Sequence, residues 1–273
     1  MHFMYGTAAG RFILKPVTAP LLSRAAGGLL SSRLSAVFVR GFVRRNKIDM
    51  SQYEDRKYLS FNDFFTRRIL PERRRVCMEP EALVSPCDGR LTVYRIDEAA
   101  ELVIKGVPYN VRELLRDGEL AARFAGGLAL VFRLCVDDYH RYCWFDGGEA
   151  ERAVHIPGVL NTVRPVALRS VPVFRENSRE YTLLHSESFG DAIQMEVGAT
   201  MVGRIANLPH AGTVRRGEEK GMFMFGGSTV VLLLRQGAAE LEAELLRQTA
   251  GETEVVVKMG QRIGSRARRD MGE

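Results

Sequence analysis

Hydrophobic and polar residues follow different patterns in the two parts of the chain, and the change falls near residue 84. Before it, apolar stretches interrupted by single basic residues predict helices. After it, short runs of β-branched and aromatic residues bounded by Gly, Pro and Asp predict strands and turns. Helices followed by strands is the order of an α+β protein, here with N-terminal helices and a β-rich single domain of sandwich-like or barrel-like form.

The predicted helices lie between residues 5 and 69. Residues 5–46 are expected to be helical, with interruptions at two prolines and a Gly-Gly pair. Within 51–69 two helix starts are predicted, one at Ser51, which has an acid three residues later, and one at Ser60 or Asn62. Two arginines stand near the end of the second helix, where cations suit the helix dipole.

The β-rich part is expected to contain one short helix, 111–118, among strands. The predicted strands are 83–96 as strand, turn and strand, 128–136, 138–145 and 151–160 as the arms of a hairpin, 188–208 as two strands around Gly198, 229–237, and a short strand within 252–266. The run 229–237 is the most uniformly apolar of these, so we expect a fully buried strand there.

Composition permits a folded core and points to an anionic partner. Of 273 residues, 46% are hydrophobic and 26% charged, with a net charge of +6. Such a chain is not disordered by composition. Its positive charge suits either nucleic acid or a membrane surface, and the total alone does not choose between them.

The distribution of charge favours the membrane. Residues 1–47 contain eight Lys or Arg and no acid, and the first acidic residue is Asp49. The uncharged runs are far shorter than the roughly 20 residues that a spanning helix needs. We therefore expect 1–48 to be a basic, apolar, helical segment that associates with an anionic membrane surface, and we expect no nucleic-acid partner. Two alternatives stay open: amphipathic helices that cover the core, and an import signal.

The four cysteines show no CxxC spacing, so a zinc site or a thioredoxin-like site has little support. We expect no metal, and reduced thiols are the default for such a chain.

The tetrapeptide Gly226-Gly227-Ser228-Thr229 stands directly before the most apolar predicted strand, where glycine is unusual. Glycines allow backbone conformations that other residues rarely adopt, so the Ser228 hydroxyl can be held against its preceding carbonyl and attack it, giving an ester. Elimination and hydrolysis would then convert the serine to a pyruvoyl group. Taken alone, the tetrapeptide is most typical of a simple turn, and it is not a Walker A loop.

Among the five histidines, His140 has the most suggestive neighbours, because the preceding Asp137 and Asp138 could orient a base. In the predicted hairpin, His155 falls opposite residue 139 or 140, which would bring the two histidines together. A slip of one residue would put their rings on opposite faces. Asp88, in SPCDG, is by itself typical of a turn.

Seven segments, each modest alone, form a specific combination when they are taken in order. They are FNDFFTRRI, SPCDGRL, IKGVPYNVRELL, DDYHRYCWFDGG, RENSREYTLL, VGATMVGRI and EEKGMFMFGGSTVVLL. Together they resemble the phosphatidylserine decarboxylases of the shorter bacterial type, over about residues 3–260.

The resemblance implies a self-cleaving proenzyme with a catalytic domain at 49–273. Its Gly-Ser-Thr motif matches Gly227-Ser228-Thr229, so cleavage is expected between Gly227 and Ser228. One precursor would then give a β chain, 1–227, and an α chain, 228–273, whose Ser228 becomes the pyruvoyl cofactor. The self-cleavage aspartate of the family matches Asp88, and the first histidine of its His-Arg-x-His motif matches His140.

One position departs from the family pattern. The second histidine of the motif, the usual self-cleavage base, is replaced here by Cys143. Our hypothesis is that His140 or His155 takes this role. A Cys143 thiolate would need an electropositive setting to lower its pKa.

The implied activity is the conversion of phosphatidylserine to phosphatidylethanolamine and CO2 through a Schiff base on the pyruvoyl group, with His140 in proton transfer. A phospholipid substrate fits the basic N-terminus and predicts a peripheral protein on the cytoplasmic side of the cell membrane, with a homodimer as one option for its assembly. Two other functions stay open: a pyruvoyl decarboxylase of a soluble amino acid, and an uncleaved, non-enzymatic membrane-binding homologue.

Overall fold

The computed structural model describes residues 28–97, 101–160, 175–198, 204–210, 212–226, 228–249 and 254–267. The predicted helical region 5–27 therefore lies outside the described residues, as does Gly227. The helices are α4 (Val37–Arg45), α5 (Phe61–Phe65), α6 (Val111–Leu115), α7 (Gly118–Ala122) and α8 (Ala243–Thr249), with 3-10 turns η1 (Arg33–Ala36), η2 (Met50–Gln52) and η3 (Pro71–Arg73).

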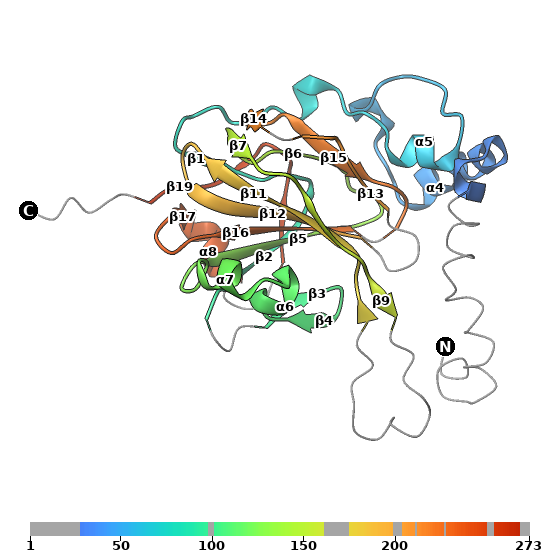
Figure 1. The fold of residues 1–273 in the computed structure, drawn as a ribbon. Helices are drawn as coiled ribbons and strands as arrows, with labels where there is room; N and C mark the ends of the chain where they lie inside the picture. Colours follow the sequence, from blue (N-terminus) through green and yellow to red (C-terminus); the bar gives the residue numbers. More distant parts are fainter. Residues whose placement is uncertain are drawn as a thin grey trace, which may run out of the picture.

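A nine-stranded antiparallel sheet forms the centre of the molecule (Figure 1). In spatial order its strands are β14 (Gly212–Val214), β7 (Gly148–Ala150), β11 (Arg179–Ser186), β12 (Gly190–Val197), β16 (Ser228–Leu234), β5 (Leu128–Leu134), β2 (Gly89–Arg95) and β18 (Val255–Val257), and β8 (Val154–Ile156) also pairs with β11. The central position of β16 explains its mostly apolar composition. A strand pairs with it on each side and protein covers both of its faces, so every residue of β16 is buried.

Smaller sheets surround this one. They are β1 (Ala82–Val84) with β19 (Arg262–Arg266) and β17 (Ala239–Leu241), β13 (Ile205–Asn207) with β15 (Glu219–Phe223) and β6 (Arg141–Cys143), β3 (Leu102–Ile104) with β4 (Val107–Tyr109), and β9 (Val159–Leu160) with β10 (Arg175–Glu176). Helices α4 and α5 lie at one side of the molecule (Figure 1), and Asn62 of α5 accepts a hydrogen bond at 3.2 Å from the N–H of Phe225, two residues after β15.

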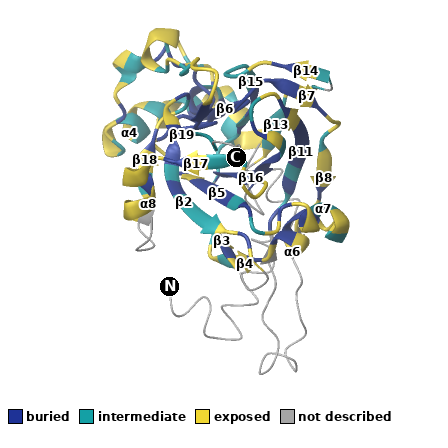
Figure 2. Cartoon of the chain, turned by 90° about the vertical axis from the view of Figure 1, so that its left-hand side faces the viewer, coloured by how far each residue is buried: buried dark blue, intermediate teal, exposed yellow. Residues whose placement is uncertain are grey.

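Two hydrophobic cores lie on the two faces of the central sheet. Successive residues of β16 point to opposite faces, so Val230 and Leu232 join one core while Val231 and Leu233 join the other. The first core also includes residues of β1, β19 and α8, and the second includes residues of α6, α7 and the β3–β4 hairpin. Figure 2 shows the consequence, with buried strands inside and exposed residues concentrated on the helices.

The predicted α+β class with a β-rich part is confirmed. The barrel-like alternative is not observed, since the described strands of the central sheet end at two edges, β14 and β18. The strands predicted at 128–136 and 229–237 are present as β5 and β16, and those around Gly198 as β12 and β13.

The helix predictions have mixed outcomes. Ser60 caps α5 as expected, because its hydroxyl accepts a hydrogen bond from the Asp63 N–H at 3.1 Å. The helix start at Ser51 is wrong: Asp49 caps only the 3-10 turn η2, and an extended residue follows at Tyr53. The helix predicted at 111–118 ends at Leu115, because Arg116 adopts a left-handed conformation.

Candidate active site

The register of the central sheet brings Ser228 and Asp88 to the same end of the sheet. Ser228, the first residue of β16, pairs with Leu134, the last residue of β5. The preceding residue of β5, Arg133, pairs with Arg90 of β2. Asp88 lies two residues before Arg90, just outside β2, and is therefore at the end of the sheet where β16 begins.

Ser228 is held tightly against the loop before it. Its side chain is buried, and its Oγ donates a hydrogen bond to the carbonyl oxygen of Gly226 at 3.1 Å. Gly226 has a φ of 145°, a conformation that residues with a side chain rarely adopt. Next to it, the buried Thr229 Oγ1 has no hydrogen-bond partner among the described residues. The chain therefore folds back sharply just before the serine, as the glycines predict.

Asp88 is a buried carboxylate whose two oxygens are both engaged. The Arg74 guanidinium binds it through two hydrogen bonds, Nε to Oδ1 at 2.8 Å and Nη2 to Oδ2 at 2.7 Å. The Met259 N–H donates to Oδ1 at 2.9 Å, and Lys258 Nζ lies 3.4 Å from Oδ2. Asp88 is thus fixed in place as a charged group by two cations and a backbone donor.

His140 is buried and presents one unoccupied nitrogen. Its Nδ1 lies 3.0 Å from the carbonyl oxygen of Asp138, and since a carbonyl only accepts, Nδ1 carries the proton and donates. Nε2 is then the unprotonated nitrogen, and it has no partner among the described residues. Burial, assisted by the nearby charge of Arg67, lowers the pKa of His140 to about 3 against the opposing effects of the Asp138 carbonyl and Asp88. The imidazole is therefore neutral at neutral pH.

His140 is also joined to the loop that leads to Ser228. The Phe223 N–H, at the end of β15, donates to the His140 carbonyl oxygen at 2.9 Å. The ring of Phe65 lies 4.0 Å from the imidazole and 5.1 Å from the ring of Phe225, centroid to centroid. The structure thus gathers the serine, the aspartate and this histidine in one region, although no hydrogen bond among the described atoms links their side chains directly.

The predicted hairpin between 138–145 and 151–160 is wrong. β6 pairs with β15 in a small sheet, whereas β7 and β8 pair with β11 in the central sheet. The Asp146-Gly147-Gly148 segment carries the chain from one sheet to the other, with the Asp146 carboxylate held by Arg216 and Ser186.

His155 consequently does not lie opposite His140. It sits on β8 opposite Glu180, its side chain is 59% exposed, and its Nδ1 lies 3.7 Å from a Glu180 carboxylate oxygen.

Cys143 occupies the core. Burial raises the pKa of its thiol to about 12, so the thiol stays protonated at neutral pH. The electropositive setting that a thiolate base requires is not provided by the described residues, because desolvation is the dominant influence on this group.

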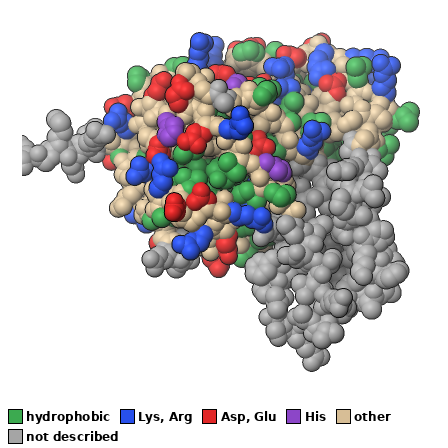
Figure 3. Space-filling view, in the orientation of Figure 1, with side chains coloured by type: hydrophobic (Ala, Val, Ile, Leu, Met, Phe, Trp, Pro, Cys, Tyr) green, Lys and Arg blue, Asp and Glu red, His purple; other side chains and the backbone are tan. Residues whose placement is uncertain are grey.

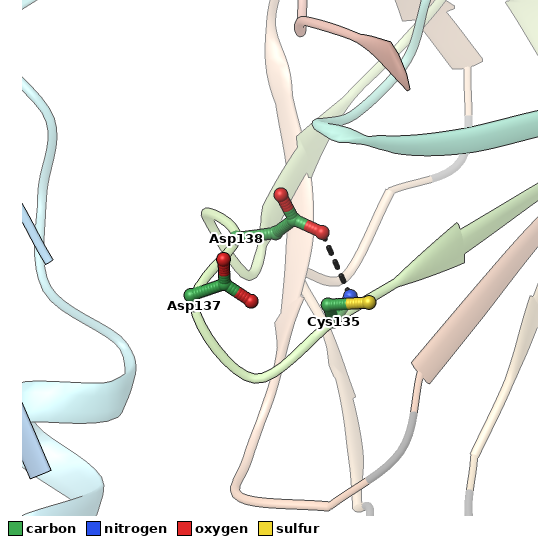
Figure 4. Close-up of side chains that lie close together, drawn as sticks. All are labelled: Cys135, Asp137 and Asp138. Carbon is green, nitrogen blue, oxygen red and sulfur yellow. Dashed lines mark hydrogen bonds between the residues drawn. The ribbon is translucent and has the colours of Figure 1, made fainter. Parts of the chain in front are cut away.

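Three possible metal ligands, Cys135, Asp137 and Asp138, lie close together in the turn that precedes His140 in the sequence, and Figure 4 shows their side chains. The Asp138 carboxylate already accepts hydrogen bonds from the Cys135 N–H at 2.7 Å and from Arg90 at 3.1 Å. The Cys135 sulfur accepts one from Arg133 at 3.2 Å. The guanidinium groups of Arg90 and Arg133 thus already bind two of the possible ligand atoms, and the cluster has the character of a hydrogen-bonded turn.

A separate cavity of about 400 Å³ opens elsewhere on the molecule, and none of the four predicted site residues lines it. Its lining residues are Trp144, Arg152, Ala153, Glu180, Thr182, Asn207, Leu208, Pro209, His210 and Lys220.

Sequence reasoning missed three side chains of this region. Arg74, which holds Asp88, stands in a run of three arginines that sequence alone does not distinguish. Phe65 and Arg67 belong to the FNDFFTRRI segment, but nothing in its spacing indicates that they lie beside His140.

Comparison with known proteins identifies the family of this chain. Residues 61–265 match the family model for phosphatidylserine decarboxylase. The chain belongs to the phosphatidylserine decarboxylase family. It is 41% identical over 266 residues to phosphatidylserine decarboxylase proenzyme 2 of Clostridium acetobutylicum, covering 97% of this chain and 91% of that protein.

Other members of the family are similarly close. The phosphatidylserine decarboxylase proenzyme of Ruminiclostridium cellulolyticum is 37% identical, covering 97% of this chain and 90% of the relative. One from Clostridium botulinum is also 37% identical, covering 97% and 92%. Membership confirms the predicted resemblance and makes the chain an enzyme of the decarboxylase class.

Proposed function

We propose that this protein is a self-processing, pyruvoyl-dependent decarboxylase that converts phosphatidylserine to phosphatidylethanolamine and CO2. The observation that carries the proposal is the buried Ser228, bonded back to Gly226 across a sharp bend and lying at the sheet end where Asp88 is fixed. The relatives named as proenzymes support a chain that is processed after synthesis.

Self-cleavage would begin with attack of Ser228 Oγ on the carbonyl carbon of Gly227. The bond from that carbon to the Ser228 nitrogen breaks, and an ester replaces the peptide. Loss of the Ser228 α-proton then expels the Gly227 carboxylate, and water displaces ammonia to leave a pyruvoyl group at residue 228. Residues 1–227 and 228–273 become the β and α chains.

We assign the base of this reaction to His140. A base needs an unprotonated nitrogen, and His140 Nε2 is neutral, buried and without a partner among the described residues. The exposed His155 and the protonated Cys143 lack these properties. The Asp88 carboxylate would act as a fixed negative charge that favours the imidazolium once His140 has taken the proton.

The surroundings of Ser228 fit a pyruvoyl group. The hydroxyl of Thr229 is buried without a partner among the described residues, and a hydroxyl can donate a hydrogen bond to a carbonyl group formed at the neighbouring residue. The pyruvoyl group would supply an electrophilic carbonyl that takes up the substrate amine and accepts the electron pair released as CO2 leaves. The buried position of residue 228 would exclude water, and His140 could return a proton to the product carbon.

A lipid substrate is supported by the helices beside the site. Leu34, Val37 and Phe38 are between 60% and 79% exposed, which is unusual for large apolar side chains grouped on one short segment. Basic and hydrophobic side chains stand together at the upper right of Figure 3, where α4 and α5 lie in Figure 1. The inner side of α4 reaches the site, since the rings of Phe42 and Phe225 lie 6.3 Å apart.

We therefore propose that α4, with the preceding residues, docks on an anionic membrane surface at the cytoplasmic side of the cell membrane. Among the helices in the described part of the chain, none has the length and apolar composition needed to cross a membrane.

Mass spectrometry of the purified protein tests the proposal. We expect two fragments that divide at Gly227–Ser228, with the smaller one resistant to N-terminal sequencing, and an uncut chain of 30.6 kDa for Ser228→Ala. An uncut wild-type chain would favour a non-enzymatic membrane-binding homologue. CO2 release from free serine at the rate seen with phosphatidylserine liposomes would instead favour a decarboxylase of soluble amino acids.

A further inference from the structure

Arg67 is a fully buried arginine beside His140 that the proposed chemistry does not use. Its Nη2 donates to the Tyr53 hydroxyl at 3.2 Å and to the carbonyl oxygens of Asp137 at 3.3 Å and Asp138 at 3.4 Å. Its guanidinium carbon lies 4.3 Å from the ring centroid of Tyr53 and 4.8 Å from that of Phe64. Aromatic rings and carbonyls therefore hold this cation.

This environment is a costly one for a cation. Nε and Nη1 of Arg67 are buried without partners among the described residues, and its observed hydrogen bonds go to neutral oxygens. A buried charge that is not matched by a carboxylate destabilises a fold. A residue placed in this way calls for a role besides stability.

The carbonyl oxygen of Asp138 indicates that role, because it is shared. It accepts from Arg67 Nη2 at 3.4 Å and from His140 Nδ1 at 3.0 Å, so its two lone pairs are used by these two donors. The side chain of the same residue is held separately by the Cys135 N–H and Arg90. The Asp138 residue is thus clamped at both its carbonyl and its carboxylate.

We propose that Arg67 is a positioning residue that sets the tautomer of His140 through the carbonyl oxygen of Asp138. The inference rests on the proposed function of His140 as the base. With the carbonyl fixed by Arg67, the proton of the neutral ring stays on Nδ1, and Nε2 remains the acceptor. The charge of Arg67 has a separate effect: it opposes protonation of the ring and so helps to keep it neutral, whereas the hydrogen bond to the Asp138 carbonyl and the charge of Asp88 favour protonation.

Arg179 provides a matched control for the experiment. It is also a buried arginine, and its guanidinium donates to the carbonyl oxygens of Leu114, Asn177 and Glu113 and lies 5.4 Å from the ring centroid of Tyr109. Arg179→Met therefore removes comparable contacts from β11, where the residue contacts α6, and leaves the loop of His140 untouched.

The first measurement is the nitrogen-15 NMR spectrum of the histidine rings in the full-length Ser228→Ala precursor, with the His140 signal assigned by His140→Gln. We expect a single neutral tautomer protonated on Nδ1 in the precursor and in its Arg179→Met variant. In Arg67→Met we expect a mixture of tautomers, whereas Arg67→Gln, whose amide can donate to the carbonyl, retains the Nδ1-protonated form.

The second measurement is the rate of self-cleavage with Ser228 present. Arg67→Met should slow it about tenfold or more, Arg67→Gln by less, and Arg179→Met should stay within about threefold of the wild type. An equal slowing by Arg67→Met and Arg179→Met would overturn the proposal, as would an unchanged His140 tautomer in Arg67→Met.

The Ser228→Ala precursor that keeps Arg67 provides a test that does not depend on a variant of Arg67. If its His140 carries the proton on Nε2, the proposal fails even where Arg67→Met does not fold. The spectrum also tests the role of Arg67 separately from the proposed self-cleavage, because the tautomer of His140 can be observed in a chain that never cleaves. Absence of cleavage in the wild type would refute the proposed function and leave the spectral test intact.

Discussion

Removal of Arg74 should destabilise the protein strongly, because it leaves Asp88 as a buried charge without its main partner. The two side chains are 9% and 1% exposed and are joined by hydrogen bonds of 2.8 and 2.7 Å. Breaking a buried pair of this kind from one side costs about 3–5 kcal/mol. Lys258, at 3.4 Å and 47% exposed, and the Met259 N–H remain, so we expect Arg74→Met to cost about 3 kcal/mol, the lower end of that range.

The assay is urea unfolding in the Ser228→Ala background, which keeps the chain in one piece. With a slope of about 3 kcal/mol per molar urea, a loss of about 3 kcal/mol moves the midpoint down by about 1 M. Arg68→Met is the matched control, since Arg68 lies 3.5 Å from Glu219 in a pair that is 55% and 29% exposed, and such surface pairs contribute about 0–1 kcal/mol.

The double variant tests the cause. Adding Asp88→Asn to Arg74→Met removes the uncompensated charge and should recover part of the lost stability. The reasoning is refuted if Arg74→Met lowers the free energy of unfolding no more than Arg68→Met does. It is also refuted if Asp88→Asn destabilises the Arg74→Met variant as much as it destabilises the protein that keeps Arg74, because Arg74 would then not be stabilising the buried charge of Asp88.

Three further predictions follow from the geometry of the site. His140→Ala should abolish self-cleavage, whereas His155→Ala should cleave at the wild-type rate, because the His155 side chain is exposed and lies beside Glu180. Gel analysis of freshly synthesised chains measures both rates. A cleavage defect in His155→Ala would contradict the assignment of the base to His140. Gly226→Ala should lower the free energy of unfolding by about 1–3 kcal/mol and slow cleavage, since a φ of 145° strains any residue with a side chain. Gly41→Ala, in the middle of α4 with open space around it, should instead raise the free energy of unfolding by about 0.5–1 kcal/mol. The folded chain keeps His140 neutral down to a pKa of about 3, below the ordinary 6.5, so the unfolded chain binds the extra proton between these values. Stability should therefore fall as the pH drops below about 6.5, by up to about 1.4 kcal/mol per pH unit, and His140→Gln in the Ser228→Ala background should flatten this slope in urea unfolding at pH 7, 6 and 5. An unchanged slope would show that another group dominates.

Sequence patterns determined the parts of this protein that depend on local chemistry. The uniform apolar run of β16 indicated a strand covered on both faces, the Ser60 cap marked the start of α5, and the Gly-Gly pair marked the bend before Ser228. Each of these is a property of a few consecutive residues and the conformations open to them, so it survives whatever the rest of the chain does.

Tertiary structure alone decided which residues meet. The predicted strands 138–145 and 151–160 are suited to a hairpin by their sequence, but β6, just after His140, pairs with β15, and β8, which carries His155, pairs with β11, so the two histidines are separated. In the same way, only the folded chain selects Arg74 from three neighbouring arginines and sets Arg67 and His140 on one carbonyl oxygen. Pairing of distant strands depends on burial summed over the whole core, and no local pattern records that sum.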